Sequence, residues 1–401
     1  MGRVSVLGAL QYFLDPTHTK LGVKLRRALC WNDADINVSL VGKTAVVTGA
    51  NSGIGRATAE SLATRGARVH MVCRSRERGA AALESIRASV AAQRVEASAE
   101  DANNVHLHIV DLSEPDQIKT FAKDFRSREK SLDILVNNAA VMPNELRFNS
   151  KNQEVALATN LLGFFGLTTE MKPLLETSQD PRVVNVVSAG MFAAKLDIPT
   201  VGSGLDREKC EAARENYSGL DLYAQHHRGR GMDVPRGPND GAGGGRVRHL
   251  PPRLEPPPRF PPPTACLPSQ TDLCSLSALL SLSLSLSLSL PVMLTKHFSE
   301  AFASSGIKVN SVHPGWVDTP GLSSAKDMAG FYKVMGSSLR TEEEGADTVV
   351  WLAVSDKANK YSGRYFFDRA TRRENKYLSG TKSPPEDLDR LVEICETGFG
   401  A

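Results

Sequence analysis

Short apolar runs alternate with longer amphipathic segments along two parts of this 401-residue chain. Between residues 43 and 223, five apolar runs predict strands, namely Thr44–Val47, Val69–Cys73, Val105–Val110, Ile134–Val136 and Arg182–Val187. Segments with helical spacing separate them, at Ala57–Arg65, Arg78–Ser89 and Pro115–Arg128. Strands that are apolar on both faces are typical of a parallel sheet covered by helices on both sides. The pattern therefore predicts a single doubly wound α/β domain.

This pattern stops near residue 228 and resumes at Val292. The segment between contains PPRLEPPPRFPPP, GAGGG and an uninterrupted Ser–Leu alternation from Ser281 to Leu290. Such a composition supplies neither a helix nor a packed core, and the Ser–Leu tract is too short and too rich in hydroxyl groups to span a membrane. We therefore divide the chain into an N-terminal extension (1–40), a first part of the domain (41–228), an insertion expected to be disordered (229–291) and the remainder with its tail (292–401). A perfect dipeptide repeat also suits a retained intron, which sequencing the transcript would test.

Charge and cysteine content exclude several classes of function. The net charge is only +3, without the clustered basic face that nucleic acid binding requires. The six cysteines have no CxxC spacing, which favours reduced thiols in an intracellular protein, either cytoplasmic or membrane-associated, over a disulfide frame or a metal site. Apolar residues at helical spacing from Val4 to Leu14 predict a helix that either packs on the domain or makes a peripheral membrane contact. The second alternative is favoured by a basic patch at Lys20, Lys24, Arg26 and Arg27.

The stretch TGANSGIG, Thr48–Gly55, lies between the first predicted strand and the first predicted helix. Gly49 suits a tight turn there, and Gly53 and Gly55 allow the backbone to approach a pyrophosphate at the helix N-terminus. In this position the glycine spacing predicts a dinucleotide site. After the second strand, where a free ribose 2′-hydroxyl usually meets an acidic residue, the chain has Arg74. A guanidinium suits a 2′-phosphate, so we predict NADP(H) over NAD(H).

These motifs and later ones resemble the short-chain dehydrogenase/reductase family and follow its order: TGANSGIG, VDLS, NNAA, ATNLLG, NVVSAG, YAQHH and HPGWVDTPG. The resemblance implies a Rossmann fold, a small carbonyl or alcohol substrate, no metal ion, and self-association as a homodimer. The family's NNAG ends here in Ala140, a mild departure. The cofactor site implied by the resemblance comprises Gly49, Ser52, Gly53, Ile54, Gly55, Arg74, Asp111, Leu112, Asn138, Ala139, Pro314, Gly315, Val317 and Thr319.

The same resemblance implies that Tyr223 is the acid/base, that Ser188 positions the substrate oxygen and that Asn160 holds a water molecule. Hydride transfer to a carbonyl leaves negative charge on its oxygen, which a phenol can protonate. The family's Lys, four residues after the Tyr, is replaced here by His227, which is shorter and mostly neutral at pH 7. The insertion also separates the Tyr from Val292–Gly306, which looks like the second half of the same helix.

Three hypotheses follow from this conflict between a well-ordered set of motifs and a broken catalytic helix. The first is an NADP(H)-dependent oxidoreductase that reduces carbonyls or oxidises alcohols. The second is a catalytically impaired nucleotide-binding protein, because His227 replaces the Lys and the helix is interrupted. The third is an active enzyme whose coding sequence is represented here with an error.

Overall fold

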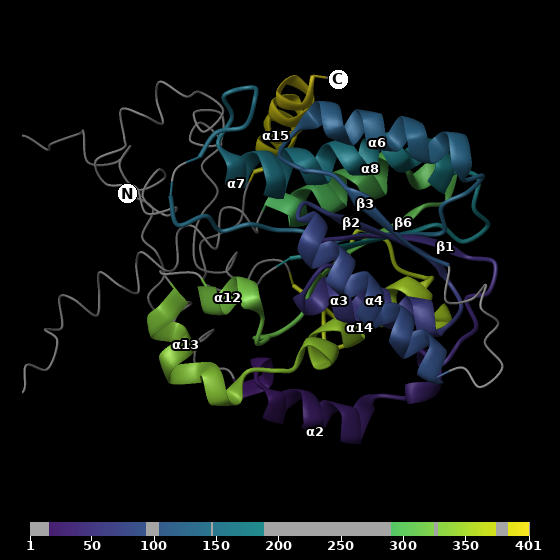
Figure 1. Ribbon diagram of the computed structural model, residues 1–401, viewed down its shortest axis with the longest axis vertical. Helices are drawn as coiled ribbons and strands as arrows, with labels where there is room; N and C mark the ends of the chain where they lie inside the picture. Colours follow the sequence, from purple (N-terminus) through teal and green to yellow (C-terminus); the bar gives the residue numbers. More distant parts are fainter. Residues whose placement is uncertain are drawn as a thin grey trace, which may run out of the picture.

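The computed structural model describes residues 16–93, 104–145, 147–187, 290–324, 328–373 and 384–400. These residues form one eight-stranded sheet with the order β3-β2-β1-β4-β5-β6-β7-β8. The strands from β3 to β7 are parallel, and β8 runs antiparallel to β7. Helices lie on both sides of the sheet (Figure 1). The predicted doubly wound α/β fold is therefore confirmed.

The central strands are apolar on both faces because each of them is covered twice. Nearly every residue of β1, β2, β4 and β5 is buried, whereas the edge strand β3 is only partly covered. All five strands expected from the apolar runs occur, with ends that differ by one residue. The strands are β1 (Thr44–Thr48), β2 (Arg68–Cys73), β3 (Val105–Ile109), β4 (Ile134–Asn137), β5 (Arg182–Val186), β6 (Lys308–His313), β7 (Tyr365–Phe367) and β8 (Ala370–Arg372).

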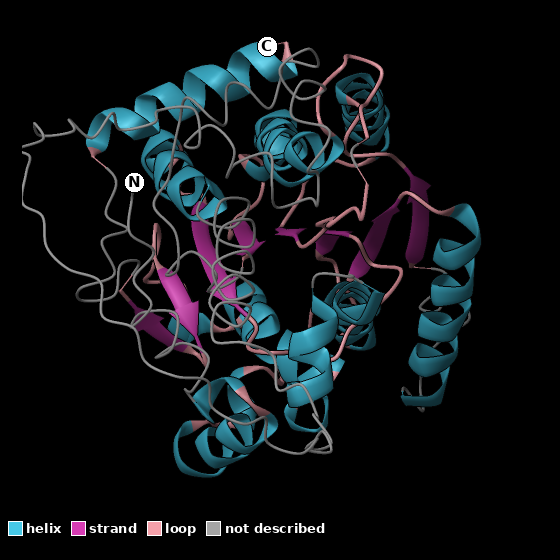
Figure 2. Ribbon diagram, turned by 90° about the vertical axis from the view of Figure 1, so that its left-hand side faces the viewer, coloured by secondary structure: helices cyan, strands magenta, loops and turns pink. Residues whose placement is uncertain are grey.

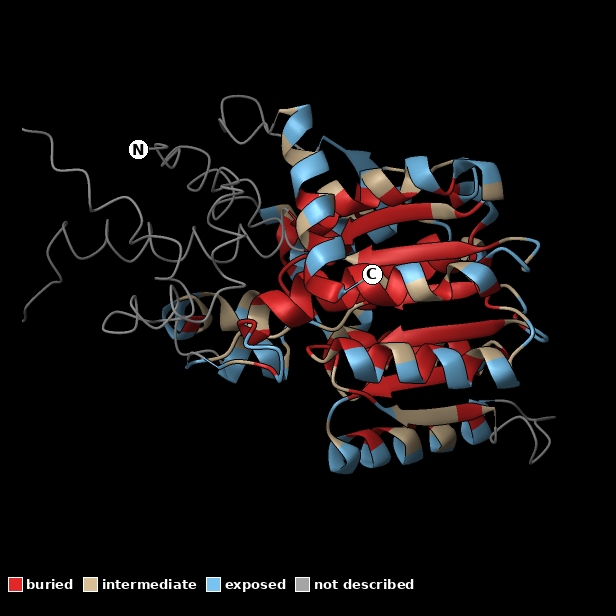
Figure 3. Cartoon of the chain, turned by 90° about the horizontal axis from the view of Figure 1, so that it is seen from above, coloured by how far each residue is buried: buried red, intermediate tan, exposed pale blue. Residues whose placement is uncertain are grey.

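Two helical layers enclose the sheet, as Figure 2 shows from the side. One core packs α6 (Pro115–Arg128), α8 (Phe164–Leu175), the helix over 290–301 and α15 (Pro385–Phe399) on one face. The other core packs α3 (Gly53–Thr64), α4 (Arg76–Gln93) and α14 (Glu342–Val354) on the opposite face. Buried residues concentrate between these layers and the strands (Figure 3). Shorter helices are α2 (Lys20–Cys30), α7 (Val155–Leu157), α12 (Pro320–Ser324) and α13 (Ala329–Met335).

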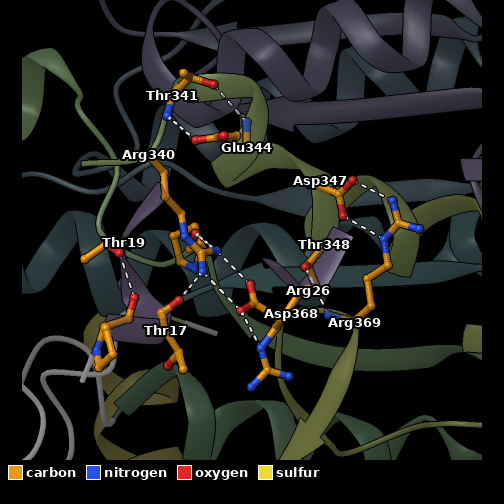
Figure 4. A network of polar contacts seen from close by, with 12 residues as sticks. Thr17, Thr19, Arg26, Arg340, Thr341, Glu344, Asp347, Thr348, Asp368 and Arg369 are labelled. Atoms are coloured by element: carbon orange, nitrogen blue, oxygen red, sulfur yellow. Dashed lines mark hydrogen bonds and ion pairs between the residues drawn. The ribbon is translucent and has the colours of Figure 1, made fainter. Parts of the chain in front are cut away.

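Two residues of the N-terminal extension, Thr17 and Arg26, contact a buried ion pair in the second half of the chain (Figure 4). Arg340 donates to both carboxylate oxygens of Asp368, at 2.7 and 3.1 Å, and also to the backbone carbonyl of Thr17 at 2.6 Å. Arg26 of α2 reaches the same carboxylate at 3.2 Å. The side chains of Arg340 and Asp368 are almost fully buried, so these contacts join the extension to the interior of the second half of the chain. The helix expected over Val4–Leu14 lies outside the described residues.

The helix over 290–301 is held against the sheet by a chain of buried polar groups. Asn137 of β4 donates to Thr168 at 3.0 Å and to the side-chain oxygen of Asn185 at 3.1 Å. Asn185 of β5 in turn donates to the hydroxyl of Thr295 at 2.8 Å. Of the insertion expected over 229–291, the structure describes Leu290 and Pro291, and both already belong to this helix. The rest of that segment lies outside the described residues.

The helix α15 covers α6 and α8 from outside. Its side chains Leu391, Cys395 and Phe399 are buried, and burial raises the pKa of the Cys395 thiol. The Phe399 ring lies directly over Gly166, so a β-carbon added to that glycine would clash with the ring. Lys119 of α6 donates to the Gly400 carbonyl at 2.6 Å. The C-terminal tail is thus an integral part of this layer.

Candidate cofactor and substrate site

A cavity of about 710 Å³ opens where the carboxyl ends of β1, β2, β3 and β4 meet. The strand order reverses between β1 and β4, and open parallel sheets bind ligands in the crevice at such a point. Ten of the fourteen expected cofactor residues line this cavity, namely Gly49, Ser52, Gly53, Ile54, Arg74, Asp111, Leu112, Asn138, Ala139 and Thr319. The sequence motifs that lie far apart in the chain are therefore brought to one site.

The glycine turn is shaped by close contact with the end of β4. Gly49 has φ +66°, and a β-carbon on it would lie 3.0 Å from the Ala139 Cα. Gly55 lies in the first turn of α3, behind the cavity, where a β-carbon would lie 2.5 Å from the Gly49 carbonyl oxygen. Neither site has room for a side chain, which explains both glycines without any ligand. The N-terminus of α3 faces the cavity through Ser52, Gly53 and Ile54.

Thr48 joins the two strands that flank the crevice, a role that the sequence analysis did not assign. Its hydroxyl accepts from the backbone N–H groups of Asn138 and Ala139, both at 2.9 Å. The Asn138 side chain donates back to the Thr48 carbonyl at 2.9 Å. The signal was present in the sequence, because Thr48 opens the TGANSGIG motif.

The basic side of the cavity is made by Arg74 and Arg78, which both line it and are both exposed. Arg76 lies between them in sequence but lines a separate groove beside β3, together with His106 and Arg128. The neighbouring Cys73 is not a nucleophile, because burial raises the pKa of its thiol to about 11. Opposite the arginines, one carboxylate oxygen of Asp111 accepts from both the backbone and the hydroxyl of Ser113, at 2.9 and 2.7 Å.

Asn160 lies on a π-helical turn, Ala158–Gly163, between α7 and α8. Its side-chain oxygen accepts from the Val141 N–H at 2.8 Å, and its side-chain nitrogen donates to the Val141 carbonyl at 2.9 Å. Both ends of the amide are thus used to fix the loop after β4 along the cavity wall. Turns of π-helix are frequent at functional sites, which fits the position of Asn160 at the cavity.

The remaining expected cofactor residues contact the cavity's supporting structure. Among the residues that the structure describes, Pro314, Gly315 and Val317 do not belong to the cavity lining. They follow β6 and contact the side chain or the backbone of Arg340 instead. Gly315 has φ +86° and packs directly against the Arg340 guanidinium. The segment therefore connects Thr319, which does line the cavity, to the buried ion pair of the N-terminal extension.

Three expected catalytic residues, Ser188, Tyr223 and His227, lie outside the described residues. The described chain ends one residue before Ser188, where the Val187 N–H donates to the Val312 carbonyl at 2.8 Å. It resumes at Leu290, whose side chain lines the cavity. Val187 therefore lies at the edge of the sheet where the cavity opens, and Leu290 lies beside that cavity.

Comparison with known proteins identifies the family of this chain. The family model for short chain dehydrogenases matches residues 43–196. The chain is 32% identical over 364 residues to dehydrogenase/reductase SDR family member 12 of Bos taurus, covering 90% of this chain and 88% of the relative. It is 27% identical over 345 residues to retinol dehydrogenase 11 of Mus musculus, covering 86% of this chain and 84% of that protein.

A similar fold occurs in L-sorbose reductase from Gluconobacter frateurii, solved with NADPH and L-sorbose. The two structures have a TM-score of 0.50 with 18% sequence identity, over 82% of this chain and 96% of the reductase. Fold, glycine turn and full-length similarity agree: the chain belongs to the short-chain dehydrogenase/reductase family.

Proposed function

We propose that this protein is an NADP(H)-dependent oxidoreductase that interconverts a small carbonyl compound and its alcohol. The observation that carries the proposal is the single cavity shared by the glycine turn, the N-terminus of α3 and the two arginines Arg74 and Arg78. A helix N-terminus supplies N–H groups to a pyrophosphate, and guanidinium groups suit a 2′-phosphate. The nicotinamide group would supply the hydride. The cavity volume lies within the range of ordinary cofactor sites.

The preference for NADP(H) is tested by exchanging one arginine at a time. Arg74→Ala should weaken NADPH binding about 10- to 100-fold, the usual contribution of a charge-assisted contact, and should leave NADH binding unchanged. Arg76→Ala is the matched control, because Arg76 is likewise exposed two residues later, at the start of α4, but lines a different groove. Binding can be followed by the fluorescence of the reduced nicotinamide. An unchanged ratio of NADPH to NADH affinity in Arg74→Ala would remove the argument.

For catalysis we propose Tyr223 as the acid/base and Ser188 as the residue that holds the substrate oxygen, as the family resemblance implies. The support comes from the positions of their described neighbours. The strand β5 ends two residues before Ser188 in the sequence, at the carboxyl edge of the sheet where the cavity opens. Asn160 fixes the opposite wall through its two bonds to Val141. Tyr223→Phe should abolish turnover while leaving the NADPH dissociation constant unchanged.

A second candidate function is nucleotide binding without efficient catalysis, which is favoured by His227 in the position of the family's Lys. An imidazole is shorter than a lysine side chain and mostly neutral at pH 7, so it would stabilise a phenolate poorly. This candidate predicts that the natural chain binds NADPH but turns over slowly or not at all. The two candidates therefore differ in turnover, while they agree in cofactor binding.

A repaired variant, in which the insertion is deleted, distinguishes these two candidates. The register of the helix over 290–301 indicates which residue should follow Arg228. If Leu290 follows Arg228 directly on an ideal helix, Tyr223 and His227 both fall within about 20° of Thr295. Thr295 faces the sheet, since it accepts from Asn185 of β5. Joining Arg228 to Val292 instead would rotate Tyr223 and His227 by about 200° relative to Thr295. The variant that lacks residues 229–289 is therefore the one to test, with and without His227→Lys.

The substrate class follows from the side of the cavity away from the arginines. Apolar side chains line it there, including Val141, Met142, Leu161, Leu290 and Leu322. We therefore propose apolar aldehydes, ketones or alcohols as substrates. A carbonyl panel that compares retinaldehyde and medium-chain aldehydes with sugars, using the repaired variant and NADPH consumption, tests this. Faster turnover of sugars than of the apolar carbonyls would contradict the assignment.

A further inference from the structure

The helix α2 has a row of leucines that no described part of the molecule covers. Leu21, Leu25 and Leu29 are 69%, 59% and 72% exposed, and their four-residue spacing places them on one side of the helix. Val23, on the opposite side, is only 1% exposed and faces the body of the domain. The helix is therefore apolar towards the protein and apolar again towards solvent. A folded monomer gains nothing from the second apolar row.

Basic side chains lie next to this leucine row. Lys20, Lys24 and Arg27 are all exposed, and the helix itself contains no acidic residue. Lys24 lies about 60° round the helix from Leu21, so the basic and apolar rows adjoin. Arg27 also pairs with the exposed Asp33 at 3.1 Å, which leaves the two lysines as the main source of positive charge. Arg26 points the other way, to the buried Asp368.

The position of α2 restricts the kind of partner. The helix lies outside both layers of the sheet, along the lower margin in Figure 1, with α6 and α15 at the opposite side. A lipid bilayer accepts such a helix, with its leucines in the acyl boundary and its lysines at anionic headgroups. We propose that α2 docks this protein on the surface of an anionic lipid bilayer.

The docking helix is connected to the cavity wall through a series of direct contacts. His18, just before α2, stacks on Trp316 with 5.3 Å between ring centroids, and the Trp316 N–H donates to the His18 carbonyl at 3.0 Å. Trp316 also contacts Phe331 of α13 edge to face. Thr319–Leu322, a few residues further on, line the cavity. Docking through α2 would therefore hold the folded domain itself at the lipid surface.

The test is sedimentation of the full chain with vesicles of phosphatidylcholine alone or mixed with phosphatidylserine. We expect binding to the mixed vesicles that weakens as salt is added. Exchanging Leu21, Leu25 and Leu29 together for Ser should lower the partition coefficient about 100-fold or more. Lys20→Gln and Lys24→Gln should each lower it about fivefold on the mixed vesicles and have no effect on phosphatidylcholine alone.

Two matched controls are available on other surfaces. Val41→Ser removes a side chain that is 66% exposed, and Lys123→Gln removes an exposed lysine of α6; neither should change vesicle binding. A thermal melt checks that the leucine variant is folded. Vesicle binding that survives the three leucine exchanges would overturn the proposal, and so would a wild-type chain that binds no vesicles. A dimer in lipid-free solution that the leucine exchanges convert to a monomer would assign the row to a second copy instead.

Discussion

The carboxylate of Glu342 accepts a hydrogen bond from the backbone N–H of Gly53 at 3.1 Å. A side chain at the start of α14 thereby occupies one N–H group at the N-terminus of α3, beside the cavity. Its second oxygen accepts from Arg56 at 2.9 Å, which fixes the carboxylate in place. A negative charge therefore lies at the helix end that is expected to bind a pyrophosphate.

Glu342→Gln should tighten NADPH binding by about two- to fivefold at low salt. The amide keeps an oxygen for the Gly53 N–H but removes the charge that opposes the pyrophosphate, and charges near a helix end contribute about 0.3–1 kcal/mol. Isothermal titration or fluorescence measures the dissociation constant. Glu343→Gln is the control, since that carboxylate is mostly exposed and 3.9 Å from Arg56. Weaker binding in Glu342→Gln would show that the carboxylate mainly positions the helix.

Asp368→Asn should lower the free energy of unfolding by about 3–5 kcal/mol, because it leaves the buried Arg340 without a charged partner. Urea unfolding measures the change. The comparison variant is Glu60→Gln, which breaks the more exposed pair with Arg56 and should cost about 1 kcal/mol or less. Equal losses of unfolding free energy in the two variants would contradict a special importance of the buried Arg340–Asp368 pair.

Stability should fall as the pH decreases below about 6.5 because a buried and a half-buried histidine are held in neutral form. Burial and neighbouring charges lower the pKa of His70 to about 2 and that of His108 to about 4. In the unfolded chain each ring titrates near 6.5, so the unfolded state binds more protons between about pH 6.5 and 4. Each ring then lowers stability by up to about 1.4 kcal/mol per pH unit.

His70→Phe should make this pH profile shallower. The exchange removes one of the two titrating rings and keeps an aromatic side chain against Phe125. The rings of His70 and Phe125 meet edge to face, with 4.7 Å between their centroids. Urea unfolding at several pH values gives the slope for both proteins. The profiles should coincide in shape above pH 7, where both rings are neutral in both states. Parallel profiles below pH 6 would refute this origin of acid sensitivity.

Gly166→Ala should displace α15 and destabilise the protein by about 1–3 kcal/mol, because the added methyl group would overlap the Phe399 ring. Limited proteolysis of the C-terminal helix, followed by mass spectrometry, detects the displacement directly. Gly321→Ala is the matched control, since a β-carbon there meets nothing within 4 Å. The same cleavage rate in both variants would argue against the contact.

The fold and the cofactor turn were predictable because their signals are local. Apolar runs of three to six residues mark the strands of the sheet, and the spacing from Gly49 to Gly55 specifies a turn between a strand and a helix. Contacts between distant segments carry no such signal. Neither the bond from Gly53 to Glu342 nor the attachment of Asp368 to Arg26 follows from periodicity, because each joins residues that are hundreds of positions apart in the chain.

The N-terminal helix shows the same limit in another form. The sequence groups Lys20, Lys24, Arg26 and Arg27 in one basic patch, but Arg26 turns inwards to Asp368 while Lys20 and Lys24 are exposed. A helix places neighbouring residues about 100° apart, so adjacent charges in sequence need not share a surface. Which of them faces the body depends on tertiary contacts that only the folded structure supplies.

The buried hydrogen bond between Asn185 and Thr295 has a further consequence for how this chain tolerates change. It fixes the rotation and axial position of the helix over 290–301 through that helix's own contact with β5. A slip by one residue would leave an amide without a partner in the core, which costs about 1–3 kcal/mol. The chain that precedes Leu290 can therefore differ greatly in length without shifting the strands that follow. These buried hydrogen bonds therefore keep the second half of the sheet in position when the length of the preceding segment changes.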